Sequence, residues 1–156
     1  MARRGSSGRT GGVLLRGVAQ GDLPVLFDHQ KDPAAIRMAG VPPRDLAAFE
    51  AHWARMLADE TFTNRAVLFE GRVAGHVMSF ERGGHREIGY WIGREHWGKG
   101  VATEALSQFL ARAEARRPLR AKVARHNAGS VRVLERCGFV IVGEGDGAYD
   151  LRLTAG

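Results

Sequence analysis

Apolar residues along this chain change their spacing from one segment to the next. In residues 44–60 they recur every three or four positions, which predicts a helix with one apolar face. Residues 66–70, 73–81 and 86–93 are instead runs rich in β-branched and aromatic side chains, and glycines separate them. We therefore expect a helix that packs on a sheet, followed by an antiparallel meander of three strands.

The remaining segments predict four more strands and three more helices. Pro118 is a signal for the end of one helix, and Gly138 is a signal for the end of another. Strands are expected at residues 13–18, 119–125, 139–145 and 148–153, and helices at residues 22–30, 98–115 and 127–138. This order implies an α+β sandwich, in which a mixed, mostly antiparallel central sheet of six to seven strands has helices on both faces.

Size and composition indicate one ordinary domain with a basic tail. The chain has 156 residues, of which 44% are hydrophobic and 26% charged, as is usual for globular proteins. Residues 1–12 are rich in Gly, Ser and Arg, so we expect a disordered basic tail there and one domain in residues 13–156. Three basic residues lie in this tail, which weakens any conclusion from the net charge of +6.

Several classes of protein are disfavoured by what the sequence lacks. No apolar run is long enough to cross a bilayer or to act as a signal peptide, so we expect no membrane partner and a cytoplasmic location. Cys137 is the only cysteine, and we expect it to be a buried helix-end residue without an activated thiolate. The six histidines lack the paired spacing of a zinc site, so no metal is expected. The chain also lacks a recognition helix and interleaved exposed aromatics, which argues against nucleic acid as a partner.

One stretch carries candidate chemistry, IGYWIGREHWGKGVATEAL at residues 88–106. Gly98 and Gly100 remove two β-carbons where a predicted strand turns into a helix, and they leave amide groups at the helix start free to face an anion. A pyrophosphate would suit this turn, although an ordinary strand-to-helix connection explains the same residues equally well. Nearby basic residues suit either a polyphosphate ligand or a solvated face. They are Arg116, Arg117, Arg120, Lys122 and Arg125.

Two motifs resemble those of the GCN5-related N-acetyltransferase (GNAT) family. WGKGVATEAL at residues 97–106 is similar to the acetyl-CoA loop of the family, and HNAGSVRVLERCGF at residues 126–139 is similar to the second signature of its RimJ/RimL-like ribosomal-protein N-acetyltransferase branch. The resemblance covers most of the chain from Val13. It implies the GNAT fold and an acyltransferase that moves an acetyl group from acetyl-CoA, its cosubstrate, to a primary amine by direct transfer. That amine would be a protein N-terminus, a lysine or a small amine.

The resemblance also implies how the cofactor binds. The strand at residues 86–93 would carry a bulge that separates it from the strand at residues 119–125, which opens a slot for the pantetheine arm. Tyr90 and Gly93 would line this slot. Trp97 stands where the family has Gln or Arg. Because the family's pyrophosphate contacts come mainly from main-chain amides, this departure affects a side-chain contribution more than cofactor binding. The expected cofactor-binding residues are Trp91, Ile92, Trp97, Gly98, Lys99, Gly100, Val101, Ala102, Thr103, Asn127 and Ser130.

Ser130 and Glu87 are the expected catalytic residues. By the resemblance, Asn127 contacts the pantetheine, and the Ser130 hydroxyl lies near the sulfur, where it can protonate the leaving thiolate. Both residue types also suit the first turn of a helix, so capping alone is the alternative interpretation. An acceptor amine must lose a proton before it attacks, and Glu87 is the first candidate for the base, against the alternative of a solvated charge at a strand end.

Other readings stay open. Glu144 is the second candidate for the base, followed by His85 and Asp150, or no single residue acts as the base. A coenzyme A-binding sensor or scaffold without turnover is the alternative function. The expected partners are acetyl-CoA and an amine acceptor, for a monomer or a homodimer. Acceptor choice is expected in the loops around residues 31–44 and in the closing hairpin.

Overall fold

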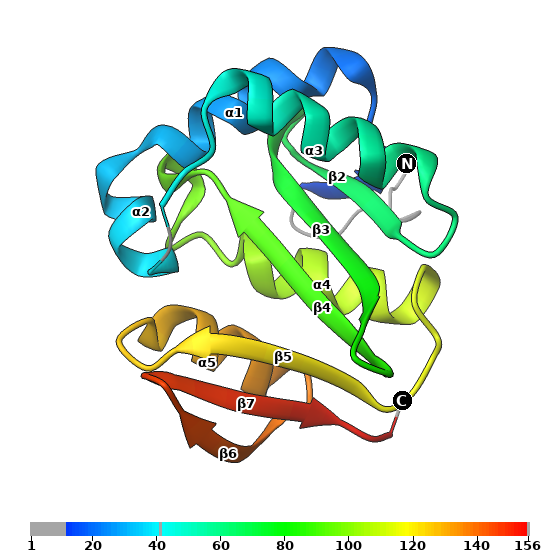
Figure 1. Cartoon of the computed structure of the whole chain (residues 1–156), viewed down its shortest axis with the longest axis vertical. Helices are drawn as coiled ribbons and strands as arrows, with labels where there is room; N and C mark the ends of the chain where they lie inside the picture. Colours follow the sequence, from blue (N-terminus) through cyan, green and yellow to red (C-terminus); the bar gives the residue numbers. More distant parts are fainter. Residues whose placement is uncertain (1–11, 41, 156) are drawn as a thin grey trace.

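A seven-stranded sheet forms the centre of the described part of the molecule (Figure 1). The computed structural model describes residues 12–40 and 42–155, so the predicted tail lies outside the described residues apart from Gly12. The strands are β1 (Val13–Arg16), β2 (Thr63–Phe69), β3 (Arg72–Arg82), β4 (His85–Ile92), β5 (Leu119–Ala124), β6 (Val140–Gly145) and β7 (Ala148–Leu153). Their spatial order is β1-β2-β3-β4-β5-β7-β6. Only β4 and β5 pair in parallel, which confirms a mixed, mostly antiparallel sheet.

Helices lie on both faces of the sheet, as predicted. They are α1 (Leu23–Lys31), α2 (Pro33–Ala39), α3 (Leu46–Ala58), α4 (Val101–Arg112) and α5 (Ala128–Arg136), with short 3-10 helices η1 (Gln20–Asp22) and η2 (Arg94–His96). Figure 1 shows α1 and α3 across one face, over β2 and β3, and α4 and α5 on the other. None of the described helices combines the length and the apolar character needed to span a membrane.

Helix α2 corrects the prediction of a loop around residues 31–44. The side chain of Asp32 accepts a hydrogen bond of 3.0 Å from the backbone N–H of Ala35, and Pro33 opens the first turn. Gly40 ends the helix in the left-handed region, with φ of 74°. The start and stop signals were present in the sequence, but the helix has only seven residues and no long apolar stripe to reveal it.

Two apolar clusters hold the layers together. The larger lies between the sheet and the α4 and α5 side, and it includes Phe109, Leu134 and Leu151, each of which is at most 1% exposed. The smaller contains Phe49 and Trp53 of α3, which pack on the opposite face of the sheet. Burial of these side chains is the main force that fixes the helices relative to the strands.

Strands β4 and β5 are paired at one end and apart at the other. Their parallel register comprises two residue pairs, Arg86 with Leu119 and Glu87 with Arg120. Beyond this point the two strands diverge, as Figure 1 shows. The backbone of β4 after Glu87 therefore has no neighbouring strand on its β5 side within the described residues.

The bulge that we predicted in the strand at residues 86–93 is absent. The register of β3 against β4 runs without a shift from Gly75 opposite Ile92 to the hairpin end. A side chain cannot fit at Gly75, because its β-carbon would collide with the carbonyl oxygen of Trp91. Gly75 thus lets β4 lie close against β3 at this end, and the register pairs the two strands from here to the hairpin. β4 leaves β5 by following β3, and no bulge is needed.

A buried carboxylate fastens the paired end of β4. Glu114, just after α4, is 1% exposed and accepts hydrogen bonds from the Ser79 hydroxyl on β3 and from Arg86 Nε on β4, the latter at 3.1 Å. Arg116 adds a backbone bond of 3.0 Å and a guanidinium bond of 2.9 Å. Ser79 and Arg86 belong to β3 and β4, so Glu114 joins the end of α4 to the β3–β4 hairpin, while Arg116 binds it within its own connection.

Glu114→Gln is expected to destabilise the protein in a pH-dependent way. Burial alone would raise the pKa of Glu114, but the hydrogen bonds from Ser79, Arg116 and Arg86 outweigh it and lower the pKa. Because the pKa is lower in the folded state, the carboxylate stabilises the fold above its unfolded pKa of about 4.3 and loses this effect as the pH falls through the folded value. At pH 7 the variant should lose about 3 kcal/mol of unfolding free energy, because the buried Arg86 loses its buried anion and keeps only the exposed Glu81 at 3.6 Å.

Urea denaturation at pH 7 and at acidic pH measures this effect. The exposed Glu60→Gln is the control and should behave like the wild type at both values. An equal loss of stability for Glu114→Gln at both pH values would contradict the assigned role of the charge.

Candidate functional site

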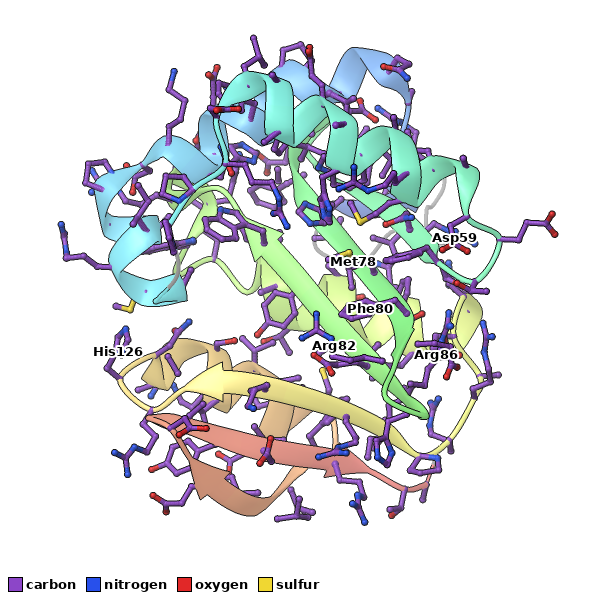
Figure 2. The ribbon with its side chains drawn as sticks, viewed as in Figure 1. Asp59, Met78, Phe80, Arg82, Arg86 and His126 are labelled. Atoms are coloured by element: carbon purple, nitrogen blue, oxygen red, sulfur yellow. The ribbon has the colours of Figure 1, made fainter. Side chains whose placement is uncertain are left out.

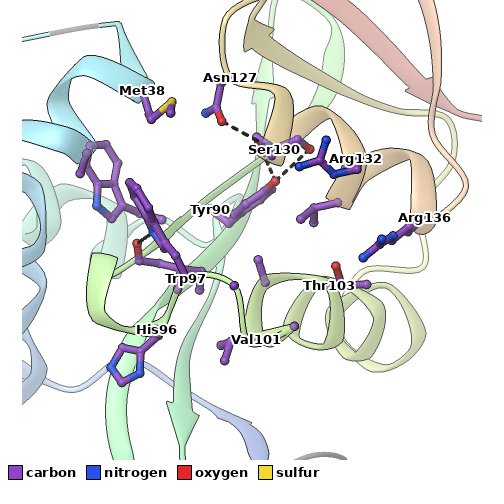
Figure 3. Close-up of a pocket in the computed structure, with 18 of the residues that line it drawn as sticks. Met38, Tyr90, His96, Trp97, Val101, Thr103, Asn127, Ser130, Arg132 and Arg136 are labelled. Atoms are coloured by element: carbon purple, nitrogen blue, oxygen red, sulfur yellow. Dashed lines mark hydrogen bonds between the residues drawn. The ribbon is translucent and has the colours of Figure 1, made fainter.

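A cavity of about 440 Å³ lies beside the free end of β4, next to the first turns of α4 and α5 (Figure 3). α2 contributes the outer wall through Ala35, Met38 and Ala39. The loop after β5 contacts α2 close to this wall, where the His126 ring nitrogen and the Arg37 carbonyl oxygen are 2.6 Å apart (Figure 2). The cavity therefore occupies the space that the divergence of β4 and β5 leaves open.

The start of α4 presents unpaired backbone amides to this cavity. Gly98 and Gly100 adopt left-handed conformations with φ of 75° and 77°, which glycine reaches without strain. Gly100 is the N-cap and offers no side-chain acceptor. In the described part of the chain, no backbone N–H of residues 98–103 donates to a protein acceptor. By contrast, Asp45 caps α3 and accepts from the N–H of Ala48 at 2.8 Å.

Trp97 has a structural task at the end of β4. Its indole Nε1 donates a hydrogen bond of 2.8 Å to the carbonyl oxygen of Ile92, and 39% of the residue is exposed. The bond satisfies a backbone group that has no partner on β5 and holds the turn before α4 against β4. Trp97 therefore lines the cavity, but its only hydrogen-bond donor is already bound to Ile92.

Asn127 and Ser130 meet at the first turn of α5. Asn127 is the N-cap, and its Oδ1 accepts the N–H of Ser130 at 3.2 Å. The capping interpretation therefore holds, and both residues also line the cavity. Capping uses the amide oxygen of Asn127, so the amide nitrogen is left to face a ligand.

Tyr90 reaches across from β4 to Ser130. Its hydroxyl oxygen lies 2.5 Å from Ser130 Oγ and 3.3 Å from the Ser130 carbonyl oxygen (Figure 3). Burial raises the pKa of Tyr90 to about 12, although the bond to Ser130 works in the opposite direction. The sequence placed Tyr90 along the slot but gave no sign of this bond, because its partners lie 40 residues apart.

Two arginines on the cavity wall were missed by the sequence analysis. Arg132 and Arg136 of α5 line the cavity, one helical turn apart. The basic residues singled out instead do not line it, and several have other partners. Arg116 and Arg117 bond to Glu114, and Arg125 pairs with Glu144 at 2.6 Å. The spacing of four residues between Arg132 and Arg136 on the predicted helix could have indicated that these two side chains share one face.

Glu87 lies at the point where β4 and β5 part, outside the cavity wall. It is on the opposite side of β4 from Tyr90, because the two are three positions apart in a strand. Its side chain is 20% exposed and lies 3.9 Å from Arg82, which also covers the ring of Phe80. Figure 2 shows Phe80 and Arg82 along one side of β3.

No carboxylate lines the cavity among the described residues. The other candidate bases also lie outside the cavity wall. Glu144 is on β6 and pairs with Arg125, and His85 is the first residue of β4. Asp150 is on β7, opposite Lys122 of β5. Except for Lys99, every predicted cofactor-binding residue lines the cavity. The ammonium of Lys99 lies instead over the ring of Phe69, 5.9 Å from its centre.

Cys137 and the histidines show no sign of nucleophilic or metal chemistry. Burial raises the pKa of Cys137, and its Sγ donates a long bond of 3.7 Å to the Thr103 carbonyl. This agrees with an unactivated thiol. His96 lines the cavity with its pKa lowered by burial. In the described ranges, no group of three or more His, Cys, Asp and Glu residues is placed to hold a metal ion.

Comparison with protein families gives one clear match. A family model described as "Acetyltransferase (GNAT) domain" matches residues 13–140 of this chain. The matched segment contains the diverging strands, the start of α4 and all of α5. It therefore includes every residue of the cavity wall.

Individual relatives agree with this match. The uncharacterized N-acetyltransferase p20 of Bacillus licheniformis is 28% identical over 139 residues, which cover 81% of this chain and 78% of that protein. The structure of spermidine N-acetyltransferase from Vibrio cholerae in complex with CoA and spermine has a TM-score of 0.77 at 21% identity and covers 92% of this chain and 94% of its own. An aminoglycoside acetyltransferase in complex with coenzyme A has a TM-score of 0.75 at 21% identity, covering 91% and 94%. Both structures share the fold of this chain.

Proposed function

Because this chain belongs to the acetyltransferase (GNAT) family, we propose that it moves an acetyl group from acetyl-CoA to a primary amine by direct transfer. Membership makes the protein an acetyltransferase with acetyl-CoA as its cosubstrate. The observation that best supports the proposal is the row of unpaired amides at residues 98–103, which opens into the cavity. Such a helix start favours a diphosphate through its N–H groups and its dipole.

We propose that successive parts of the cavity wall would hold successive parts of acetyl-CoA. The amides of residues 98–103 would hold the diphosphate, and Arg132 and Arg136 would balance its charge. Lys99 would take part only through its backbone, since its side chain lies over Phe69. Along β4, Trp91 and Ile92 border the place where the strand has no β5 neighbour, so the pantetheine arm would lie there like an added strand.

The chemistry of acetyl-CoA is that of a thioester: a C–N bond to the amine forms as the C–S bond breaks, the sulfur keeps the electron pair, and the proton lost by nitrogen ends on sulfur. Ser130 is the proposed acid, because its hydroxyl lies on the cavity wall at the start of α5. Asn127 is proposed to bind the pantetheine through its amide nitrogen. The cavity itself positions the two reactants and so supplies part of the acceleration.

Glu87 is the proposed base. It does not line the cavity, so it would accept the amine proton through water at the point where β4 and β5 part. Arg82 Nε lies 3.9 Å from the carboxylate and would help to orient it. Glu144 is less well placed as a base, because it lies outside the cavity wall and its carboxylate oxygen forms an ion pair of 2.6 Å with Arg125.

The finer assignments are also proposals. HNAGSVRVLERCGF supports the RimJ/RimL-like branch, and residues 13–156 would form the acetyltransferase domain. The acceptor would be a protein N-terminus, a lysine or a small amine, and it would reach the cavity past α2. One of the two structural neighbours is a complex with spermine and the other is named as an aminoglycoside acetyltransferase, which suits an amine acceptor. A cytoplasmic monomer or homodimer completes the proposal.

A coenzyme A-binding sensor without turnover is the second candidate function. The observation that favours it is the lack of any carboxylate on the described cavity wall. Both candidates need the same amides and arginines, so cofactor binding alone does not separate them.

Release of free thiol from acetyl-CoA separates the two functions. With a panel of N-terminal peptides, lysine peptides and small amines, we expect at least one acceptor to produce thiol at a rate well above hydrolysis. Acetyl-CoA at about 100 times its Kd should also stabilise the fold by about 2.7 kcal/mol in a thermal shift assay. Stabilisation without thiol release across the panel would favour the sensor.

Glu87→Gln is expected to lower kcat by about 100-fold and to leave the affinity for acetyl-CoA within about twofold. The reason is that the amide cannot accept the amine proton, whereas the residue lies outside the cavity wall. Glu144→Gln is the matched control and should keep the kcat of the wild type. Steady-state kinetics across pH measure both variants, and a wild-type pH profile for Glu87→Gln would remove Glu87 from the mechanism.

A further inference from the structure

Two hydroxyl groups are joined at the wall of the cavity (Figure 3). The Tyr90 hydroxyl oxygen lies 2.5 Å from Ser130 Oγ, and both residues line the cavity. The ring of Tyr90 packs against the larger core cluster. Packing therefore explains the ring, but a phenylalanine would pack as well, and the hydroxyl needs another reason.

The number of available hydrogens limits what this pair can do. Each hydroxyl donates one hydrogen. If Ser130 donates to Tyr90, the hydrogen of Tyr90 turns to the Ser130 carbonyl at 3.3 Å, and neither hydroxyl can donate to a ligand. If Tyr90 donates to Ser130 Oγ, the hydrogen of Ser130 stays free. The 2.5 Å bond is present in both arrangements, but the first also requires the Tyr90 hydroxyl to donate to the carbonyl over 3.3 Å, which is long for an O–H···O bond, and this favours the second arrangement.

Neighbouring groups restrict both the backbone of Ser130 and the protonation of Tyr90. The N–H of Ser130 is held by Asn127 Oδ1 at 3.2 Å, so only rotation about the side-chain bond of Ser130 is left to set its hydroxyl. The pKa of Tyr90 is raised to about 12 by burial, so Tyr90 keeps its hydrogen at neutral pH and can always donate it.

We propose that Tyr90 is a positioning residue: its hydroxyl donates to Ser130 Oγ and so directs the hydroxyl hydrogen of Ser130 into the cavity, toward the thiol sulfur of coenzyme A. The inference rests on the proposed function, in which Ser130 is the acid. It adds the residue that makes Ser130 a donor at the moment when negative charge gathers on the sulfur.

Coenzyme A itself is the probe for this inference, and no acceptor amine is required. A hydroxyl that donates to the bound thiolate stabilises it, so the pKa of the bound thiol should be lower in the wild type than in Ser130→Ala. Tyr90→Phe should raise the pKa of the bound thiol in the same direction. The double variant should match Ser130→Ala, because Tyr90 acts only through Ser130. Difference absorbance of the thiolate during a pH titration measures all four proteins at saturating coenzyme A.

Controls separate positioning from packing. Tyr149→Phe removes the hydroxyl of the other tyrosine, which lies on β7 outside the cavity wall, and should titrate as the wild type. The charged and titratable groups on the wall, His96, Arg132 and Arg136, are the same in every variant. In turnover with an active amine, Tyr90→Phe should lower kcat about tenfold and leave the KM for acetyl-CoA within about twofold.

The titration separates the positioning role of Tyr90 from the proposed role of Ser130 as the acid. If Ser130→Ala shifts the titration and Tyr90→Phe does not, or if the two shifts add in the double variant, the positioning role of Tyr90 is overturned and the role of Ser130 stands. If Ser130→Ala titrates as the wild type, Ser130 is not the acid and both proposals fail. A kcat of Tyr90→Phe equal to that of the wild type would also overturn the positioning role.

Discussion

β4 and β5 are neighbours in the sheet, yet they pair at only two positions, Arg86 with Leu119 and Glu87 with Arg120. In the interior of a sheet, unpaired backbone groups are costly, so a gap of this kind persists only where other groups occupy it. Gly75 lets β4 stay pressed against β3, and the Glu114 network fastens the paired end. The cavity exists because the sheet is held firmly on one side and left open on the other.

The two ends of the cavity offer different interactions, backbone amides at the start of α4 and hydrogen-bonded side chains at the start of α5. At the start of α4, charge is met by backbone dipoles, since residues 98–103 offer N–H groups that no protein acceptor in the described chain uses. At the start of α5, Asn127 caps the helix and fixes the backbone of Ser130, while Tyr90 sets its hydroxyl. The starts of α4 and α5 thus line one cavity, and we propose that the first holds the diphosphate of acetyl-CoA and the second lies at its sulfur.

Local sequence signals predicted much of this structure. The pattern of apolar residues predicted all seven strands and the presence of helices on both faces of the sheet. Gly98 and Gly100 predicted the turn into α4. Contacts that depend on tertiary packing could not be predicted from the sequence. They include the bond from Trp97 to Ile92, the contact of Tyr90 with Ser130 and the divergence of β4 from β5 without a bulge. α2 was missed because a short capped helix carries little periodicity.

We propose that acetyl-CoA binds through the amides at the start of α4. Amide hydrogen exchange with and without saturating acetyl-CoA tests it most directly, since exchange reports on each N–H group. We expect strong slowing of exchange at residues 98–103 and no change at Ala48, whose N–H is already held by the Asp45 cap of α3. Unchanged exchange at residues 98–103, in a protein that binds acetyl-CoA, would contradict it.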